Sequence, residues 1–441
     1  MFHEPGTGKT RTSIRILEHQ YLTKKIEAAI IVVPKSMIKT WAYELSVQGT
    51  IPYSVYEWSG MLTNGHLDKY NQATVKDKLV YFITNHDSLY GQKFLRTITH
   101  FTKKYEKYAI IIDESTAIKT MKAERTKAAI SIGHKAATRG ILTGTPIVQS
   151  PVDIYSQTQF LQKDLLGFRS FFSFKSRYCE IRRQTFGMRQ FDVVTGYRDL
   201  DDLRSKLLKF SSVVKLEDVV DMPERIFKTI LVEMAPKQME AYEELRKKAV
   251  AYIQEHEVTA VNALAMVTRL LQILSGQLKI SDGVYVSIEN NRLPALKELV
   301  DETPGQVLIW TSYVQTARDI VITLGKECIH YSSDLDIDGR EEVLDKFRNG
   351  VKCLVLNPQS AAHGLTLNEA TTSVYYNNSY NLEHRLQSLG RNYRIGQTNR
   401  TLVVDFVSPN TIEPVILAAL KKKEDVAKQL IRKEELLELL L

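Results

Sequence analysis

Short apolar segments alternate with longer segments of helical spacing along most of the chain. Apolar residues recur every three or four positions over 314–324 and 340–348, as expected of helices that bury one face. Strands that alternate with such helices predict parallel sheets covered by helices. Because ligands of open α/β sheets bind beyond the carboxyl ends of the strands, polar residues that follow the apolar segments are candidates for a site. The expected strands are residues 29–33, 79–84, 109–112, 140–143, 306–310, 327–331, 353–357, 373–377 and 401–406.

The middle of the chain does not show this alternation. Residues 238–250 and 261–275 are rich in helix-forming residues with apolar spacing, and a polar, proline-broken segment ends near residue 225. We therefore predict an α/β protein with two parallel-sheet lobes, joined by a helical insertion and a linker, and a domain boundary near residue 225. The expected domains are residues 1–160, 161–285 and 286–441.

Composition excludes several classes of protein. With 441 residues, 44% of them hydrophobic, the chain can form large cores in two or three domains. Its longest apolar runs are far shorter than the roughly 20 residues that cross a bilayer, and its first residues show no secretory signal. The three cysteines are too far apart for a local metal site, so we expect reduced thiols and a cytoplasmic location, in a bacterium or in a virus-infected cell. The net charge of +8 favours a polyanionic partner such as nucleic acid.

Residues 3–10, His-Glu-Pro-Gly-Thr-Gly-Lys-Thr, resemble a Walker A phosphate-binding loop, with His3 in place of its first glycine. Glycines let backbone N–H groups turn toward phosphates at the start of a helix, Lys9 would reach the β and γ phosphates, and Thr10 would bind Mg²⁺. A chance glycine-rich turn is the alternative. The expected nucleotide-binding residues are Pro5, Gly6, Thr7, Gly8, Lys9 and Thr10.

Two carboxylates follow the apolar segment 109–112. In phosphoryl transfer, Asp113 would hold Mg²⁺ and Glu114 would orient and deprotonate the attacking water. A turn or a helix cap is the structural alternative for an Asp-Glu pair. The position of the pair, about a hundred residues after a phosphate-binding loop, favours the catalytic interpretation.

A distant segment, residues 387–397, contains Gln387 and two arginines three positions apart, Arg391 and Arg394. Arginines from a second lobe can stabilise the charge that develops on the γ-phosphate, and they raise the rate of hydrolysis by about 10³- to 10⁵-fold. A helix face that carries salt bridges is the alternative. The arginine segment and the phosphate-binding loop together suggest a motor protein with two lobes.

Four segments resemble, in the same order, the motifs of superfamily-two helicases, which include the DEAD/DEAH-box helicases. The Thr-Gly-Thr-Pro-Ile stretch and the closing Arg-Ile-Gly-Gln are especially similar to those of Swi/Snf-type DNA translocases. This resemblance implies two RecA-like lobes, ATP and Mg²⁺ as substrate, and DNA as the partner, duplex rather than single-stranded. The compact middle segment is closer to bacterial or phage members than to chromatin remodellers. The four segments are residues 34–41, 113–119, 142–149 and 387–397.

The resemblance also implies roles for residues that the pattern alone does not single out. Thr143, Gly144 and Thr145 fall on the motif that couples the nucleotide site to the nucleic acid. Hydroxyl and amide groups after strands would contact the DNA backbone without reading its sequence, and a cap or a turn is the alternative at each position. Trp41 and Trp310 are expected in the core. The implied DNA-binding residues are Lys35, Ser36, Asn85, Thr311, Gly364 and Thr366.

Departures from the family pattern limit these expectations. Residues 362–367 and 380–382 differ from the usual motifs, so the details of DNA tracking stay open. Only Met1 and Phe2 precede His3, so we expect that the strand before the loop and the adenine-contacting residues are missing. The chain as written would then bind ATP weakly or fold poorly in its first lobe.

The function that the sequence supports best is an ATP-dependent DNA translocase with DNA-dependent ATPase activity. A strand-separating DNA helicase is the first alternative, although no wedge hairpin is evident in the sequence. A nucleic-acid-binding module with little or no ATPase activity is the second. The sequence does not distinguish roles in repair, restriction, replication or transcription.

Overall fold

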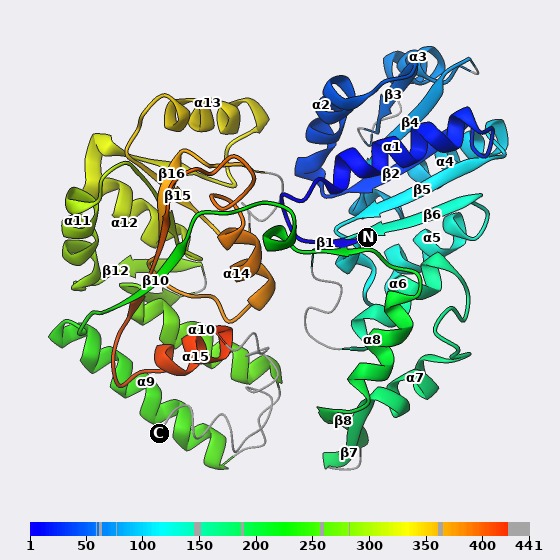
Figure 1. Cartoon of the computed structure of the whole chain (residues 1–441). Coiled ribbons are helices and arrows are strands. Elements are labelled where there is room, and N and C mark those ends of the chain that lie inside the picture. Colours follow the sequence, from blue (N-terminus) through cyan, green and yellow to red (C-terminus); the bar gives the residue numbers. More distant parts are fainter. Residues whose placement is uncertain are drawn as a thin grey trace. The chain divides into compact units, whose positions relative to one another are not determined.

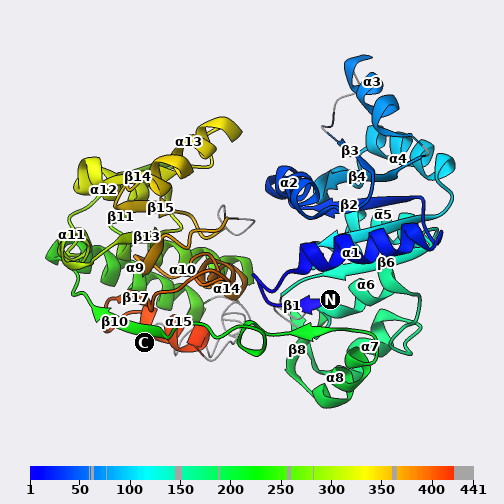
Figure 2. The same cartoon turned by 45° about the horizontal axis from the view of Figure 1, so that its top comes forward.

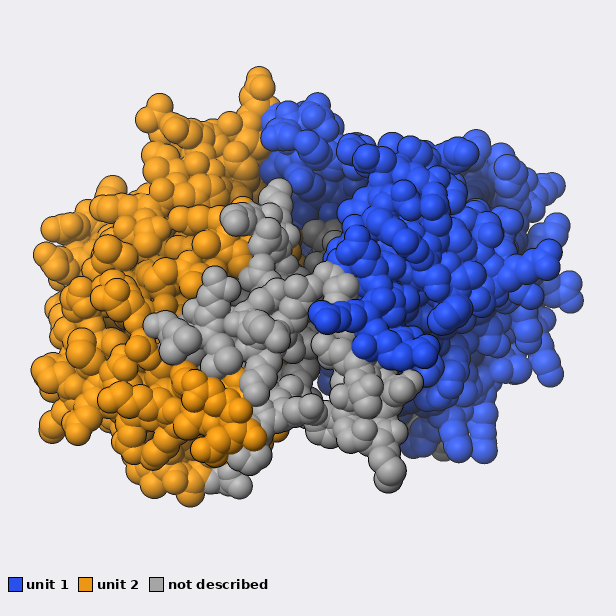
Figure 3. All heavy atoms as spheres, turned by 90° about the horizontal axis from the view of Figure 1, so that it is seen from below, with its two compact units in different colours: residues 1–220 blue, residues 221–441 orange. Residues whose placement is uncertain are grey.

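The computed structural model divides the chain into two units, Met1–Val220 and Asp221–Leu441 (Figure 3). The division lies close to the boundary expected near residue 225. The structure describes residues 1–58, 60, 64–75, 77–144, 151–186, 189–255, 260–281, 283–359 and 365–421.

A five-stranded parallel sheet forms the centre of unit 1, in the order β3-β4-β2-β5-β6. Strands β2 and β5 are buried along their whole length, which explains why they read as continuous apolar runs rather than as alternating patterns. The four strands expected in this half are confirmed, and edge strand β3 adds to them. The strands are β2 (Ala28–Val33), β3 (Tyr53–Glu57), β4 (Leu79–Asn85), β5 (Tyr108–Asp113) and β6 (Thr138–Leu142).

Helices cover both faces of this sheet (Figures 1 and 2). Successive side chains of a strand point to opposite faces, so Ile31 of β2 packs with α1 and α2, whereas Ile30 packs with α4 and α5. Both faces are therefore apolar, and polar chemistry is confined to the ends of the strands. The helices are α1 (Lys9–Leu22), α2 (Ile38–Gln48), α3 (Asn64–Ala73), α4 (Gln92–Lys104) and α5 (Glu124–Gly133).

The rest of unit 1 combines helices with an antiparallel hairpin, β7 (Cys179–Phe186) and β8 (Arg189–Tyr197). The expected helical insertion and linker, residues 161–285, also contain this hairpin, which the sequence did not indicate. Its strands carry charged residues such as Arg182 and Arg183, both exposed, so they lack the apolar run by which a buried strand is recognised. The helices are α6 (Asp153–Leu161), α7 (Phe171–Tyr178) and α8 (Leu200–Leu208).

Phe2–His3 form the two-residue strand β1, so a short part of the strand that we expected to be missing is present. It pairs in parallel with β9 (Val213–Val214). On its other side, the amino group of Met1 donates to the carbonyl of Ile141, and the N–H of Thr143 donates to the carbonyl of Met1. Backbone from distant segments of unit 1 thus holds these residues, which no local pattern could indicate.

Unit 2 contains a six-stranded parallel sheet in the order β10-β17-β16-β13-β15-β14. The five strands expected in this half are confirmed. The edge strand β10 was not expected, because its side chains are mostly exposed and the segment before it is polar. The strands are β10 (Arg225–Leu231), β13 (Gln306–Trp310), β14 (Cys328–Tyr331), β15 (Cys353–Leu356), β16 (Ala370–Tyr375) and β17 (Thr401–Val407).

Helices also cover both faces of the second sheet. Side chains of α11 and α12 pack with Val307 and Ile309, whereas α13 packs with Leu308 and Trp310. A separate cluster joins α9, α10 and α15, next to the antiparallel pair β11 (Gln277–Ser281) and β12 (Val284–Ser287). The helices are α9 (Pro236–Glu255), α10 (Ala260–Leu274), α11 (Arg292–Glu302), α12 (Val314–Leu324), α13 (Ile337–Arg348), α14 (Leu382–Leu389) and α15 (Glu413–Lys421).

The expected α/β class with two parallel-sheet lobes is confirmed by these two units. In each of the two large sheets every neighbouring pair of strands is parallel. The carboxyl ends of all strands in such a sheet therefore lie on the same side. Across the described residues of the chain, none of the helices combines the length and the apolar character needed to cross a membrane.

Candidate functional site

The loop between β1 and α1 has the backbone of a phosphate-binding loop. Gly6 and Gly8 have φ angles of 86° and 81°, in the left-handed region that favours glycine. Helix α1 begins at Lys9, and its N-cap residue, Gly8, has no side chain that could cap it. Its first backbone N–H groups therefore point toward the loop, as in helix N-termini that bind anions.

Lys9 folds back over the loop. Its Nζ donates to the carbonyl oxygens of His3 at 2.8 Å and Glu4 at 3.2 Å. The Thr7 hydroxyl also donates to the Glu4 carbonyl, at 2.7 Å. The ammonium thus bonds to the backbone oxygens of the loop.

Gly144, expected in the coupling motif, packs against the same loop. A Cβ atom at Gly144 would lie 3.0 Å from Cδ of Pro5 and 3.4 Å from the carbonyl oxygen of His3. Thr143 beside it is fully buried. The segment after β6 therefore packs against the phosphate-binding loop. Thr145, the third residue of the expected coupling motif, lies outside the described residues.

Asp113 ends strand β5 and is only 5% exposed. Its Oδ2 accepts a hydrogen bond from Nε1 of Trp41 at 2.9 Å, and its Oδ1 accepts one from the N–H of Glu114 at 3.0 Å. Burial raises the pKa of Asp113, while the Trp41 bond and the charge of Lys9 act in the opposite direction. Lys9 and Asp113 are 104 positions apart in the sequence, yet the structure brings them close enough for the charge of Lys9 to act on the pKa of Asp113.

Glu114 follows in a left-handed conformation, with φ 46° and ψ 58°. This conformation costs a residue other than glycine roughly 1–2 kcal/mol. Nε2 of His86 donates to the carbonyl of Asp113 at 2.8 Å, so the peptide group before Glu114 is held by a buried side chain. Burial lowers the pKa of His86 to about 4, so its ring is neutral at pH 7. The sequence did not single out His86 in this role.

The expected DNA-contact residues of unit 1 have different surroundings. Lys35 and Ser36 lie in the 3₁₀ helix Lys35–Met37 after β2 and are exposed. Asn85, at the end of β4, accepts a hydrogen bond from the N–H of Ser88 at 2.9 Å, so its side chain caps the next turn. Lys35 and Ser36 are accessible to a backbone phosphate, whereas Asn85 fits the alternative of a cap.

The arginine segment of unit 2 follows helix α14. Arg391 is 2% exposed, and it donates to the carbonyls of Gln387 at 2.9 Å and Leu365 at 3.1 Å. Arg394 is half-buried, and it donates to the carbonyl of Gly390 at 2.6 Å and to Oγ1 of Thr366 at 3.1 Å. The structure therefore gathers Gln387, both arginines and Thr366, whereas Gly364 lies outside the described residues.

A buried ion pair holds α14 in place. The Nη1 and Nη2 atoms of Arg385 donate to the carboxylate of Asp405, at 2.7 and 3.0 Å. Asn378 donates to the same carboxylate at 2.9 Å, and the guanidinium lies 3.5 Å from the ring centroid of Tyr375. This network ties the helix that leads to Arg391 to the central strands β16 and β17. The sequence did not indicate it, because its members are 20 or more positions from Asp405.

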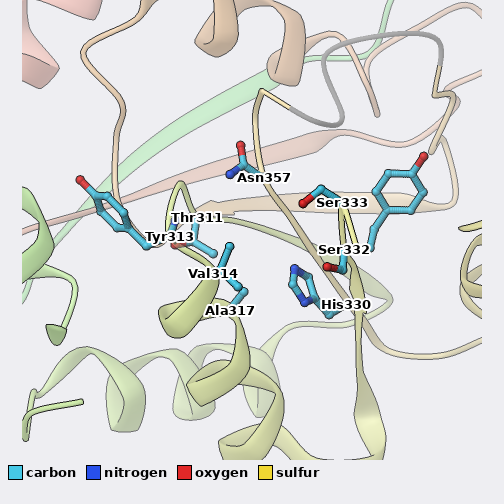
Figure 4. A pocket seen from close by; sticks show the side chains of 9 residues that line it. Thr311, Tyr313, Val314, Ala317, His330, Ser332, Ser333 and Asn357 are labelled. Atoms are coloured by element: carbon cyan, nitrogen blue, oxygen red, sulfur yellow. Dashed lines mark hydrogen bonds between the residues drawn. The ribbon is translucent and has the colours of Figure 1, made fainter. Parts of the chain in front are cut away.

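The carboxyl ends of β13, β14 and β15 surround a small pocket in unit 2 (Figure 4). Thr311, His330, Ser332 and Asn357 line it, together with residues of α12. Thr311 is only 1% exposed, and its hydroxyl accepts a hydrogen bond from Nδ2 of Asn377 at 3.1 Å. Thr311 is thus buried and bonded within the protein, at the carboxyl end of β13. Its direct contact with DNA stays a prediction.

A metal ion would need ligands beyond the protein's own carboxylates. Among the described residues there is no group of three or more His, Cys, Asp or Glu side chains that could hold one. Asp113 and the half-buried Thr10 at the start of α1 fit a cation that is also bound by substrate phosphates. These two oxygen donors would suit a Mg²⁺ ion that accompanies a nucleotide.

Two domain families match successive parts of the chain. The SNF2-related domain matches residues 1–281, and the Helicase conserved C-terminal domain matches residues 291–396. Putative protein p41 of Acyrthosiphon pisum secondary endosymbiont phage 1 is 25% identical over 96% of this chain and 91% of its own length. The mouse DNA annealing helicase and endonuclease ZRANB3 is 24% identical over 98% of this chain, which spans only 39% of that protein.

Among solved structures, the Sulfolobus solfataricus SWI2/SNF2 ATPase core in complex with dsDNA aligns with 97% of this chain and 88% of its own, with 22% identity and a TM-score of 0.41. The family assignment rests on the two domain matches, since the first alone covers more than half of the 441 residues. The chain belongs to the SNF2-related family of helicase-like ATPases.

Proposed function

We propose that this protein is a DNA-stimulated ATPase that moves along duplex DNA. The observation that carries the proposal is the environment shared by the phosphate-binding loop and Asp113. Two left-handed glycines, the N-terminus of α1 and Lys9 can bind phosphates, and Asp113 and Thr10 can bind the Mg²⁺ that accompanies ATP.

Glu114 is the proposed base. Its side chain would orient a water molecule and accept its proton while the water oxygen bonds to the γ-phosphorus. The bond from that phosphorus to the bridging oxygen breaks, and ADP and phosphate leave. Lys9 would neutralise charge on the phosphate oxygens during this step. The hydrogen bond from the His86 ring to the carbonyl of Asp113 would keep the peptide group before Glu114 in place.

The two arginines of unit 2 have different proposed roles. Arg391 is buried and its guanidinium bonds to two backbone carbonyls, so it would shape the segment. Arg394 is half-buried; its Nε donates to the carbonyl of Gly390, and its Nη1 donates to the side chain of Thr366. We therefore assign contact with the γ-phosphate to Arg394, with Gln387 and Arg391 supporting it.

DNA is the proposed polyanion. Support comes from membership of the SNF2-related family, from the net charge of +8, and from the exposed Lys35 and Ser36 after β2. A relative, mouse ZRANB3, is a DNA annealing helicase by its name. These contacts would be to the DNA backbone and independent of sequence.

Phosphate release, measured with duplex, single-stranded and forked DNA, tests the proposal. Lys9→Ala should abolish hydrolysis and weaken nucleotide binding, whereas Glu114→Gln should abolish hydrolysis and keep binding. Glu124→Gln is the matched control, because Glu124 is an exposed glutamate of the same unit whose carboxylate bonds to Lys127. Unchanged turnover in Lys9→Ala and Glu114→Gln, or no response to any DNA, would refute the assignment.

Strand separation is the second candidate, and the β7–β8 hairpin favours it. An antiparallel hairpin is the kind of element that can separate the strands of a duplex, and the sequence had given no sign of one. Parallel assays of triplex displacement and of strand displacement would decide between the two activities. Displacement of a third strand without unwinding of a fork supports translocation, and unwinding of the fork supports the helicase.

A further inference from the structure

Two buried side chains from different segments contact Asp113. Trp41 lies in the first turns of α2, is fully buried, and donates from Nε1 to Oδ2 of Asp113 at 2.9 Å. His86 follows β4, is 8% exposed, and donates from Nε2 to the carbonyl oxygen of Asp113 at 2.8 Å. One bond fixes the carboxylate and the other fixes the peptide group of the same residue.

The Trp41 bond is not a general requirement of buried tryptophans in this protein. Trp310 is equally buried, yet its Nε1 has no hydrogen-bond partner among the described residues. The core of unit 2 therefore tolerates an indole N–H without an acceptor. The direction of the Trp41 ring toward Asp113 thus needs an explanation beyond packing.

The chemical nature of the donor supplies that explanation. An indole N–H is neutral, so it orients one carboxylate oxygen without cancelling the negative charge that a divalent cation requires. A lysine or arginine at the same place would form an ion pair and compete with the cation. The bond from Trp41 thereby fixes Oδ2. Because both oxygens belong to one planar carboxylate, the position of Oδ1 is fixed with it.

The His86 bond acts on the backbone next to Asp113. Glu114 is held in the left-handed region, a conformation that residues other than glycine keep only when their surroundings impose it. The carbonyl that His86 contacts belongs to the peptide group directly before Glu114. Rotation of that peptide would break the bond and also turn the N–H of Glu114 away from Oδ1 of Asp113.

We propose that Trp41 and His86 are positioning residues that hold the carboxylate and the peptide group of Asp113 in the geometry that Mg²⁺–ATP requires. Neither side chain touches the substrate in this proposal. The inference rests on the proposed ATPase function and adds to it the residues that determine the Mg²⁺ dependence of nucleotide binding. Loss of partners that orient a metal ligand typically lowers metal affinity about 10- to 100-fold.

Calorimetric titration with a non-hydrolysable ATP analogue, in Mg²⁺ and in EDTA, tests this role without measuring activity. Trp41→Phe keeps an aromatic ring and removes the donor, so the gain in affinity on adding Mg²⁺ should fall about 10-fold while the affinity in EDTA stays the same. Trp310→Phe is the matched control and should keep the full gain. Thermal melts of both variants verify folding.

A second pair of variants tests His86. His86→Leu removes the donor and should raise the Mg²⁺ concentration needed for half-maximal hydrolysis, whereas His86→Gln can still donate to the carbonyl and should restore most of the loss. Equal loss in both would show that only ring packing matters and would overturn the role of His86.

The outcomes separate this inference from the proposed function. No binding of the analogue by the wild type would overturn the ATPase function and the inference together. Binding by the wild type with the full Mg²⁺ gain retained in Trp41→Phe, or an equal loss of affinity in Mg²⁺ and EDTA, would overturn the positioning role alone.

Discussion

The buried pair of Arg385 and Asp405 gives the sharpest stability prediction. Asp405 is fully buried and Arg385 is 7% exposed, and three hydrogen bonds at 2.7 to 3.0 Å converge on the carboxylate. Asp405→Asn keeps the shape of the side chain and removes its charge. The guanidinium of Arg385 then stays buried without its counter-charge.

The expected size of the effect follows from this burial. Removing one partner of a buried ion pair typically costs about 3–5 kcal/mol, because the other charge is left without compensation. An asparagine still offers one acceptor oxygen, so we expect the lower end, about 3 kcal/mol, for Asp405→Asn. Replacing both partners, as in Arg385→Met with Asp405→Leu, removes both charges and should cost clearly less than the sum of the single changes.

Urea unfolding followed by tryptophan fluorescence measures this effect in unit 2 alone. The chain has three tryptophans, and replacing Trp41 and Trp58 by Phe leaves Trp310 as the reporter. Its ring lies 6.1 Å from that of Tyr375, which in turn contacts Arg385. For an m value near 3 kcal/mol per M, a loss of about 3 kcal/mol lowers the midpoint by about 1 M.

A surface pair of the same unit serves as the control. Arg348 and Asp345 lie 3.1 Å apart with side chains 42% and 65% exposed, so Asp345→Asn should change stability by less than about 1 kcal/mol. If Asp405→Asn costs no more than this control, or if the double replacement costs as much as the sum of the singles, the reasoning from buried charge is wrong.

Three further predictions concern the site and the cores. Gly144→Ala places a Cβ 3.0 Å from Cδ of Pro5 in the phosphate-binding loop, so the nucleotide affinity measured by calorimetry should fall several-fold. Unchanged affinity would show that the loop can shift to accommodate the methyl group without loss of binding. Arg394→Ala should lower kcat about 10³-fold without changing the melting temperature, whereas Arg391→Ala should lower the melting temperature as well; equal melts would contradict their separate roles. Burial raises the pKa of Cys353 to about 12 and that of Cys328 further still, so a disulfide reagent at pH 8 should label these thiols only as urea unfolds unit 2; rapid labelling of the native protein would contradict their burial.

Strands with a continuous apolar run were predictable, including the edge strands β6 and β14, whereas the edge strands β3 and β10 were not. Strand β2 is apolar at every position because helices cover both of its faces. Strands β3 and β10 lie at the edges of their sheets and are largely half-buried or exposed, so their residues lack that pattern. The β7–β8 hairpin escaped detection for the same reason.

The site shows the same division between local and distant signals. Lys9 and Asp113 could be proposed as site residues because each lies in a short motif, and the charge of Lys9 acts on the pKa of Asp113 in the structure. The contact of Trp41 with Asp113 spans 72 positions, and that of Arg391 with Leu365 spans 26, so no local pattern records them. Asn85 illustrates the opposite case, since a residue after a strand can be a cap as easily as a ligand.

The left-handed conformation of Glu114 has a consequence for protein engineering. Glycine adopts φ 46° without a side-chain penalty, so relieving the strain at this position would stabilise unit 1 while removing the proposed base. A library of random variants sorted only for heat resistance would therefore enrich glycine at position 114, in proteins that lack the proposed base. A selection that also demands ATP turnover should retain Glu114.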